Sequence, residues 1–244
     1  FLRHNFGPAT IIMGDSGAYR LYEEGANPRL HRKETATLRQ RQREKHKIAP
    51  DLRAAIEQSG LRDGMTISFH HHFRNGDYIV NLVLDELARM GYKDMRIAPS
   101  SLSAVHAPVV EHIRSGLVTH IETSGCRGEL ANALSAGIMD RPVVFRSHGG
   151  RAAAIKEGDL HIDVAFLGAP SCDPFGNANG YTREGAGKSV CGSMGYARVD
   201  AAHADHVIIL TDNIVDYPNA PFGISQHDVD SIVVLDSIGD PEKI

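Results

Sequence analysis

Three histidines stand in a row at His70, His71 and His72, just before an Asn-Gly-Asp turn. Imidazole side chains can bind a metal ion, move a proton or donate a hydrogen bond to an anion. Neighbouring side chains of an extended segment point to opposite sides, so at most His70 and His72 could share one ion. No HxxxH or HExxH pattern lies nearby to complete a metal shell. The run therefore predicts a loop that grips a ligand rather than a metal site.

Four later segments carry the same kinds of side chain. They are rich in Gly, Ser, His or Arg and cover residues 99–101, 123–128, 147–151 and 169–177. Glycine lets the backbone approach a ligand, and free amides at a helix start bind anions. Arginine suits a planar, two-point grip on a carboxylate, and three of the five loops contain one: Arg74, Arg127 and Arg151. The five loops together predict a site for a carboxylate or another polyanionic ligand.

A short apolar run precedes each of these loops, and helical stretches follow the first four. We expect strands at residues 65–69, 95–98, 117–122, 142–146, 164–168, 207–211 and 231–236, and helices at 77–91, 107–115, 128–136 and 151–157. Runs that are apolar throughout are typical of strands buried on both faces, and their alternation with helices predicts an α/β fold with a largely parallel sheet flanked by helices. Ligands of such sheets bind beyond the carboxyl ends of the strands, where the five loops should lie.

Residues 1–60 lack this regularity. We expect an irregular and partly helical N-terminal arm there, followed by one α/β domain over residues 61–244. Residues 29–53 are markedly basic, which is typical of a solvated surface and is alternatively a docking surface for an acidic partner or a phosphate group.

The composition narrows the class of protein. A net charge of −4 gives no general attraction to nucleic acid or to an anionic membrane, and no apolar window approaches the roughly 20 residues that cross a bilayer. Cys126, Cys172 and Cys191 are widely spaced and odd in number, which fits neither a disulfide framework nor a CxxC metal pattern and indicates a reducing cytoplasm. The first residues contain neither a methionine nor a signal-peptide pattern, so we expect a trimmed start.

Two further motifs have simpler interpretations. "TREGAGKS" at residues 182–189 resembles a phosphate-binding loop, but Thr182 replaces its first glycine and no apolar strand leads into it, which favours a glycine-rich surface loop. Cys126 or Cys172 could act as a nucleophile with His148, although the spacing alone does not pair them. Small buried side chains are the simpler interpretation of both cysteines.

Four segments carry a more specific pattern: "SFHHHFRNGD", "ETSGCRGELANALSAGI", "FRSHGGRAAAI" and "FLGAPSCDPFGNANG". They resemble the citrate lyase alpha subunit, the citrate CoA-transferase component of that complex, and the resemblance covers most of the chain. The layout more distantly resembles other CoA-transferases, with residues 70–76 in the place of their glycine-rich loop and Asp173, Gly176 and Asn177 in the place of a later Asp…Gly-Asn element. Alpha subunits of this type have two similar α/β halves, and the chain resembles the first.

The resemblance implies an acyl exchange in which an acetyl thioester and citrate give a citryl thioester and acetate, as the transferase step of citrate lyase. The thioester would belong to CoA or to a CoA-derived prosthetic group on an acyl carrier protein, and no tightly bound cofactor is expected on this chain. The implied partners are the carrier, a lyase subunit and further subunits of an oligomer. Related transferases use an active-site glutamate, whereas the citrate lyase type is thought to use a transient mixed anhydride. Alternatives are a CoA-transferase or thioester hydrolase for another acid, such as citramalate, and a non-catalytic module that docks a carrier or a subunit.

Such a reaction must position a trianion and stabilise a tetrahedral oxyanion. We expect Arg74, with Arg127 or Arg151, to hold carboxylates. We expect the oxyanion to receive hydrogen bonds from His70, His71 and His72 and from the backbone at Asn75, Gly76, Ser124 and Gly125. The remaining residues expected at the substrate are His148, Gly149, Asp173, Gly176 and Asn177.

Overall fold

The computed structural model describes residues 11–14, 17–20, 47–70, 73–180, 194–217 and 223–243. Several sequence predictions lie outside these ranges. They concern His71, His72, Cys191, the loop at 182–189 and residues 29–46 of the basic stretch.

A seven-stranded sheet forms the centre of the molecule, with the strand order β11-β10-β7-β3-β4-β5-β6. Every neighbouring pair in it is parallel. The strands are β3 (Thr66–His70), β4 (Met95–Pro99), β5 (Val118–Thr123), β6 (Val144–Phe145), β7 (Val164–Gly168), β10 (His206–Thr211) and β11 (Ser231–Val234). The predicted strands and the parallel α/β fold are therefore confirmed, with differences of a few residues at the strand ends.

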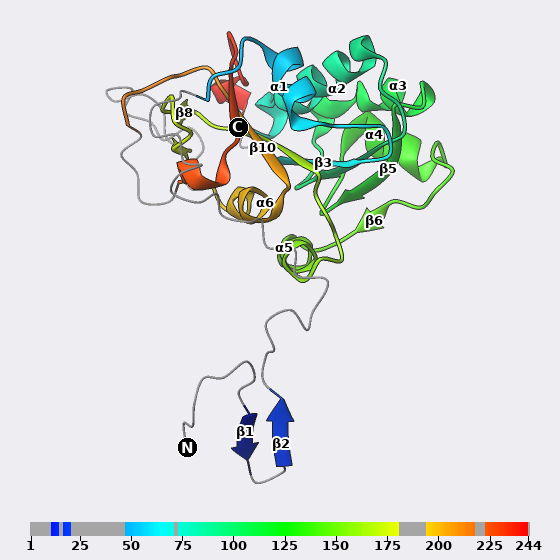
Figure 1. Cartoon of the computed structure of the whole chain (residues 1–244). Helices are drawn as coiled ribbons and strands as arrows, with labels where there is room; N and C mark the ends of the chain where they lie inside the picture. Colours follow the sequence, from blue (N-terminus) through cyan, green and yellow to red (C-terminus); the bar gives the residue numbers. More distant parts are fainter. Residues whose placement is uncertain are drawn as a thin grey trace.

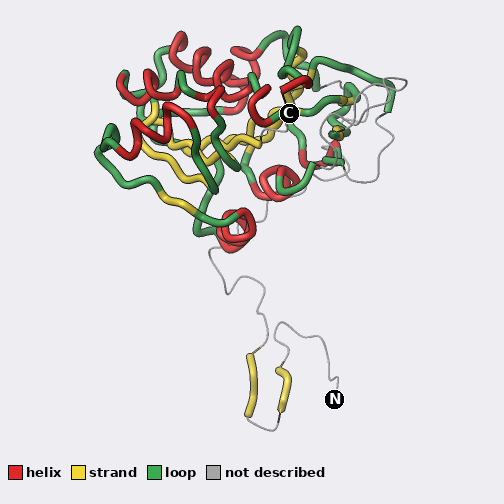
Figure 2. Tube along the Cα trace, turned by 180° about the vertical axis from the view of Figure 1, so that it is seen from behind, coloured by secondary structure: helices red, strands yellow, loops and turns green. Residues whose placement is uncertain are grey.

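Helices cover both faces of this sheet (Figures 1 and 2). One layer contains α1 (Leu52–Ser59), α2 (Ile79–Met90), α3 (Val109–Arg114) and α4 (Gly128–Ser135). The other contains α5 (His148–Glu157) and α6 (Ala197–His203). Each layer buries its own apolar cluster against the sheet, and the stacked rings of Phe69 and Phe166, 5.7 Å apart, belong to the cluster beneath the first layer.

Helix α2 shows how the sequence sets an element that supports the site. It buries Ile79, Val80, Val83, Leu84 and Leu87, and it is terminated by Gly91, whose φ of 86° suits glycine. The carboxylate of Asp77 accepts a hydrogen bond from the backbone N–H of Val80 at 3.3 Å, so it satisfies a free amide of the first turn.

The packed domain begins before residue 61. Asp51 caps α1 by accepting from the N–H of Ala54 at 2.8 Å, and Ile56 of α1 is fully buried in the main core. The N–H of Ala49 donates to the carbonyl of Ile232 on β11 at 2.8 Å. The predicted boundary at residue 60 therefore falls inside a packed unit. Earlier in the chain, β1 (Ile11–Gly14) and β2 (Gly17–Arg20) form an antiparallel hairpin.

Helix α6 and a small antiparallel pair, β8 (Ser171–Cys172) with β9 (Ala178–Asn179), had no counterpart among the predicted elements. The side chains that α6 buries are Ala197, Asp200 and Ala201, so it lacks the apolar periodicity that marks a helix. Among the described residues, no helix has the length and apolarity needed to span a membrane.

Candidate functional site

The loops that follow β3, β4, β5 and β6 form a continuous row at one edge of the sheet, because parallel strands all end there. The N–H of Ser100 donates to the carbonyl of Phe69 at 2.9 Å, and the N–H of Ser124 donates to the carbonyl of Ser100 at 3.2 Å. These bonds join three successive loops, and the N–H of Arg146 continues the row by donating to Thr123 at 3.0 Å. The predicted convergence of these loops at the carboxyl edge is confirmed.

Ser124 and His148 come together in this row. The hydroxyl of Ser124 donates to the carbonyl of Ser100, and its oxygen lies 3.4 Å from Nε2 of His148. Since the only hydroxyl proton is committed to Ser100, Nε2 of His148 must be the donor in the second contact. The His148 ring is exposed and has the Tyr196 ring at a centroid distance of 6.4 Å.

The first turn of α5 points its free amides at the same edge. Ser147 caps the helix by accepting from the N–H of Gly150 at 3.0 Å. The N–H groups of His148 and Gly149 occupy the first two helical positions, where an α-helix supplies no carbonyl partner. Both residues are exposed, so this helix start presents partial positive charge to solvent beside Ser124.

Arg127 is the exposed cation of this region. It occupies the N-cap position of α4, and within the described residues its guanidinium forms no ion pair. The next residue, Gly128, has a φ of +70°, and a Cβ there would lie 3.0 Å from the Cα of Ala104. This close packing fixes the loop that carries Arg127.

The backbone amides that were expected to bind an oxyanion are mostly engaged within the chain. The N–H of Ser124 is bound to Ser100, the N–H of Gly125 points to Oγ1 of Thr123 at 3.4 Å, and the N–H of Gly76 donates to Phe73 at 2.8 Å. This part of the prediction is therefore corrected, because turns within the loops use these donors. Asn75 differs, since it is exposed and no hydrogen bond of its N–H joins it to another described residue.

Gly76 serves the loop in another way. Its carbonyl accepts from the N–H of Asp240 at 2.7 Å, and a Cβ at Gly76 would lie 2.1 Å from the carbonyl oxygen of Asp240. The glycine thus permits a close approach to the chain's own backbone rather than to a ligand. Arg74 begins the short 3₁₀ helix Arg74–Gly76, and His70 ends β3 opposite Leu167. Of Arg74 only this backbone position is described.

A buried Asp77–His106 pair stabilises the loop after β3. Nδ1 of His106 accepts from the N–H of Ser103 at 2.9 Å, so Nε2 carries the proton that it shares with Asp77 at 3.1 Å. Both side chains are almost fully buried. The pair connects the loop after β3 to the loop after β4. His106 was missed in the sequence because it lies within an otherwise ordinary connection.

Arg151 has a different role from the predicted one. Its side chain is 2% exposed, and its two terminal nitrogens donate to the carboxylate of Asp200 at 2.8 and 2.7 Å. One of them also donates to the carbonyl of Ala98 at 2.6 Å. Arg151 does hold a carboxylate, but that carboxylate belongs to α6, and the pair fastens α5 and α6 to the sheet.

Asp173, Gly176 and Asn177 build a closed turn instead of a ligand site. Oδ1 of the buried Asp173 accepts from three backbone N–H groups, and its other oxygen accepts from the Asn177 amide at 2.6 Å. Gly176 has a φ of +105°, and a Cβ there would lie 2.9 Å from Val229. This loop follows β7, three strand positions from β5, or roughly 14 Å at about 4.8 Å per strand. Its polar groups therefore stabilise the turn, far from Ser124 and His148.

An ion pair that residue types alone did not reveal lies beside the site. Arg146, which follows β6, pairs with Glu122 near the end of β5, and Glu122 is largely buried. Both residues lie within apolar runs that were interpreted only as strands. Their charges can orient a ligand at this edge.

The cysteines give little support to a thiol nucleophile. Burial raises the pKa of Cys126, and burial followed by the charge of Asp173 raises the pKa of Cys172 to about 12. A thiol must lose its proton to attack, so both shifts oppose that role.

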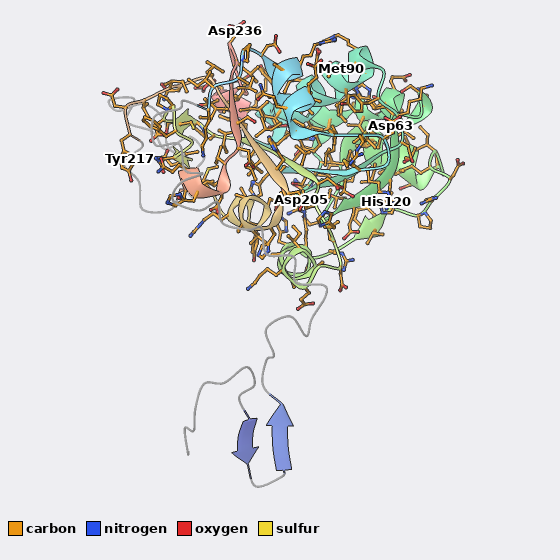
Figure 3. All side chains as sticks on the ribbon, in the orientation of Figure 1. Asp63, Met90, His120, Asp205, Tyr217 and Asp236 are labelled. Carbon is orange, nitrogen blue, oxygen red and sulfur yellow. The ribbon has the colours of Figure 1, made fainter. Side chains whose placement is uncertain are left out.

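One cluster of possible metal ligands is present among the described residues. It comprises His161, Asp163 and Asp205, whose ligand atoms all lie within 4.8 Å of one another. These residues precede β7 and β10, at the sheet edge opposite the candidate site. Asp205 is one of the residues labelled in Figure 3. His161 and Asp205 are 2.9 Å apart, an ordinary ion-pair distance.

Comparison with known proteins places this architecture in one family. The family model "Citrate lyase, alpha subunit (CitF)" matches residues 45–244. The citrate lyase alpha chain of Escherichia coli K12 is 56% identical over 198 residues, which are 81% of this chain and 38% of that protein. The corresponding chain of Haemophilus influenzae is 55% identical over 198 residues, 39% of its length. The chain thus spans about two fifths of the length of these relatives.

Solved structures support the same family assignment and show a shared fold. A structure from Streptococcus mutans, described as the alpha subunit of citrate lyase in complex with citrate, is 58% identical with a TM-score of 0.77, over 82% of this chain and 39% of that one. Glutaconate coenzyme A-transferase from Acidaminococcus fermentans has a TM-score of 0.53 at 14% identity, over 77% of this chain and 75% of that one, which shows a shared fold. The α/β architecture is thus the CoA-transferase-like one, and the chain belongs to the citrate lyase alpha subunit family.

Proposed function

We propose that the chain carries the citrate-binding and acyl-exchange site of a citrate CoA-transferase. The observation that carries this proposal is the contact between Ser124 and His148 at the carboxyl edge of the sheet, with the exposed Arg127 three residues after Ser124 in the same loop. Family membership supports it, and so does the citrate complex of the Streptococcus mutans relative.

The reaction balances without an external oxidant or reductant. A carboxylate oxygen of citrate attacks the carbonyl carbon of an acetyl thioester, and the carbonyl oxygen becomes an oxyanion. Collapse of this intermediate breaks the C–S bond and gives a mixed anhydride with a thiolate. The thiolate then attacks the citryl carbonyl of the anhydride, which releases acetate and leaves a citryl thioester.

Citrate is a trianion near neutral pH, so its binding requires positive charge that is not already neutralised. Arg127 supplies a full charge, and the free amides of His148 and Gly149 supply the partial charge of a helix start. The exposed imidazole of His148, oriented by its Nε2–H contact with Ser124, lies at the same edge. The exposed N–H of Asn75 is the backbone donor that we assign to the loop after β3.

The thioester partner is either CoA or a CoA-derived group on an acyl carrier protein. We propose that it approaches along the row of loops after β3 and β4, where residues 73–77 are held firmly by Asp240 and by His106. No tightly bound cofactor is needed, because the thioester brings the reactive carbonyl. A lyase subunit that consumes the citryl thioester completes the proposed assembly.

The test uses a chimaera in which residues 45–244 of this chain replace the matching residues of the Escherichia coli alpha chain. We expect release of labelled acetate from acetyl-CoA only when citrate is present, together with formation of citryl-CoA. Arg127→Ala should lower kcat/KM for citrate by about 10²-fold, in the range found for loss of one charge-stabilising group. Arg62→Ala, an exposed arginine in the connection before β3, is the matched control and should have no effect.

A folded chimaera that releases no citrate-dependent acetate would refute the proposal. Release of acetate without citryl-CoA would instead identify a thioester hydrolase. A lower KM for citramalate than for citrate would assign the site to a different acid.

A further inference from the structure

A cavity lies between α5, α6 and the segment that leads into the 3₁₀ helix Gln226–Asp228. Its volume is about 450 Å³. Lys156 lines it from the last turn of α5, and Arg198 and His203 line it from α6. The lining runs from Gly195 along α6 to His203, which comes just before β10.

The charges around the cavity are mainly positive. Within the part of the chain that the structure describes, neither Lys156 nor Arg198 forms an ion pair, and the acidic side chain in the lining is Asp228. The nearby Asp200 is fully committed to Arg151. The cations therefore share an opening without a matching set of carboxylates.

The state of His203 agrees with this excess of positive charge. Burial lowers its pKa most, and Lys156 lowers it further, while Asp200 and Asp228 oppose the shift. The histidine is thus a neutral hydrogen-bonding group near pH 7 that can gain a proton when negative charge arrives.

The rest of the lining suits a small organic molecule. Val199 and Ile224 contribute apolar surface, and the hydroxyl of Ser225 is a further polar group. A volume of 450 Å³ falls within the range typical of small-molecule sites, roughly 300–1,000 Å³, and exceeds the need of a single inorganic ion.

We propose that this cavity is a binding site for a small organic phosphate with at least two negative charges, of the diphosphate class. The planar fork of Arg198 can bind two oxygens of one phosphate, and Lys156 supplies a mobile point charge for the other. His203 and Ser225 complete the hydrogen bonds, and the apolar wall covers the organic part. This inference does not depend on the proposed acyl exchange, because the two sites share no residue.

Isothermal titration calorimetry of the 244-residue chain with inorganic pyrophosphate, at low ionic strength and pH 6.5, tests the proposal. We expect saturable binding at one site. Arg198→Gln and Lys156→Gln should each weaken it by about tenfold or more, as expected for loss of a charged hydrogen bond. Arg62→Gln should leave the affinity unchanged, because that arginine lies outside the cavity, and Arg127→Gln reports any binding at the carboxyl edge instead. Far-UV circular dichroism confirms that each variant is folded.

Three results would overturn the proposal. They are no binding to the unaltered chain, equal affinity in all four variants, and loss of affinity in Arg127→Gln alone, which would place the anion at the carboxyl edge. Citrate serves as the competing arm, since displacement of pyrophosphate by equimolar citrate would make the cavity a polycarboxylate site. A failure here leaves the acyl-exchange assay unaffected, so the two proposals fail separately.

The pH dependence of pyrophosphate affinity tests His203 directly, because a purely structural role of this residue would not affect it. Bound anion should raise the pKa of His203, so pyrophosphate affinity should increase from pH 8 to pH 6. His203→Gln should still bind but lose most of this increase beyond what the second ionisation of the probe itself causes. An unchanged pH profile in His203→Gln would remove His203 from the site and refute the proposed ligand set.

Discussion

Nε2 of His148 lies 3.4 Å from the hydroxyl oxygen of Ser124, although Ser124 follows β5 and His148 begins α5. The contact depends on the bond from Ser124 to the carbonyl of Ser100, which leaves the imidazole as the donor. A small hydroxyl therefore determines which nitrogen of the histidine carries its proton.

This relationship predicts unequal effects of two substitutions on citrate-dependent acetate release by the chimaera. His148→Ala removes the imidazole at this edge and should lower kcat/KM by about 10²-fold. Ser124→Ala keeps the imidazole of His148 but removes the hydroxyl that orients it. We expect kcat/KM to fall by about tenfold and the pH dependence of kcat/KM to be partly retained. Equal losses in the two variants, or none in His148→Ala, would contradict the assigned roles.

The pair of Arg151 and Asp200 predicts a stability effect without a catalytic one. Arg151→Ala leaves a buried carboxylate uncompensated and should lower the free energy of unfolding by about 3–5 kcal/mol in urea titrations. Arg127→Ala, at an exposed position, should change it by less than about 0.5 kcal/mol. Joint replacement by Arg151→Met and Asp200→Leu should recover much of the loss. If the Arg151→Ala and Arg127→Ala variants had the same free energy of unfolding, the stabilising role assigned to the Arg151–Asp200 pair would be contradicted.

Gly76 predicts a position where a single methyl group is costly. Gly76→Ala places a Cβ 2.1 Å from the carbonyl oxygen of Asp240, so the loop or residues 238–240 must move. We expect a loss of about 1–3 kcal/mol and faster hydrogen exchange at the N–H of Asp240. Gly125→Ala is the control, because nothing lies within 4 Å of its added Cβ. Equal protection of the Asp240 amide in both variants would argue against the close approach.

Cys172 should be chemically inert in the folded chain. Its pKa of about 12 leaves almost no thiolate at pH 8, and the side chain is buried. Iodoacetamide should therefore label Cys172 only after denaturation, as peptide mass spectrometry can show. Rapid labelling of native protein at this residue would disprove the expectation and reopen a nucleophilic role.

The lowered pKa of His203 predicts how the free energy of unfolding changes with pH. Its pKa in the folded chain lies below the ordinary value of 6.5, so the unfolded chain binds its proton more readily. The contribution of this residue is therefore constant above about pH 6.5 and becomes destabilising as the pH falls below it. His203→Gln should flatten the decline in unfolding free energy between pH 7 and pH 5. A steeper decline in the variant would mean that the shift has the opposite sign.

The sequence was sufficient for the sheet and for most of its helices, because buried parallel strands are continuous apolar runs. The run at residues 164–168 coincides with β7, and the run at 207–211 lacks only the first residue of β10. Helix α6 escaped detection since it packs through small residues and one buried carboxylate. The buried carboxylate of α6, Asp200, is neutralised by Arg151, which lies far away in the sequence.

The candidate site was predictable in its location but only partly in its chemistry. Residue type identified Arg127 and His148 at the carboxyl edge, where the structure leaves them exposed. The same reasoning assigned Arg151 and Asp173 to a ligand, yet both satisfy buried polar groups of the chain itself. Sequence spacing contains no information about burial after folding, so it cannot separate an arginine that binds substrate from one that anchors a helix.

The contact between Gly76 and Asp240 also has a consequence for biosynthesis. During translation β3 emerges early, whereas residues 238–240, which fasten the loop behind it, emerge much later. The loop that carries Asn75 therefore cannot take its final shape on the ribosome until nearly all of the described chain has been made. Contacts of such long sequence separation are slow to form, so the nascent chain should expose an incomplete carboxyl edge to proteases and chaperones until residues 238–240 have emerged.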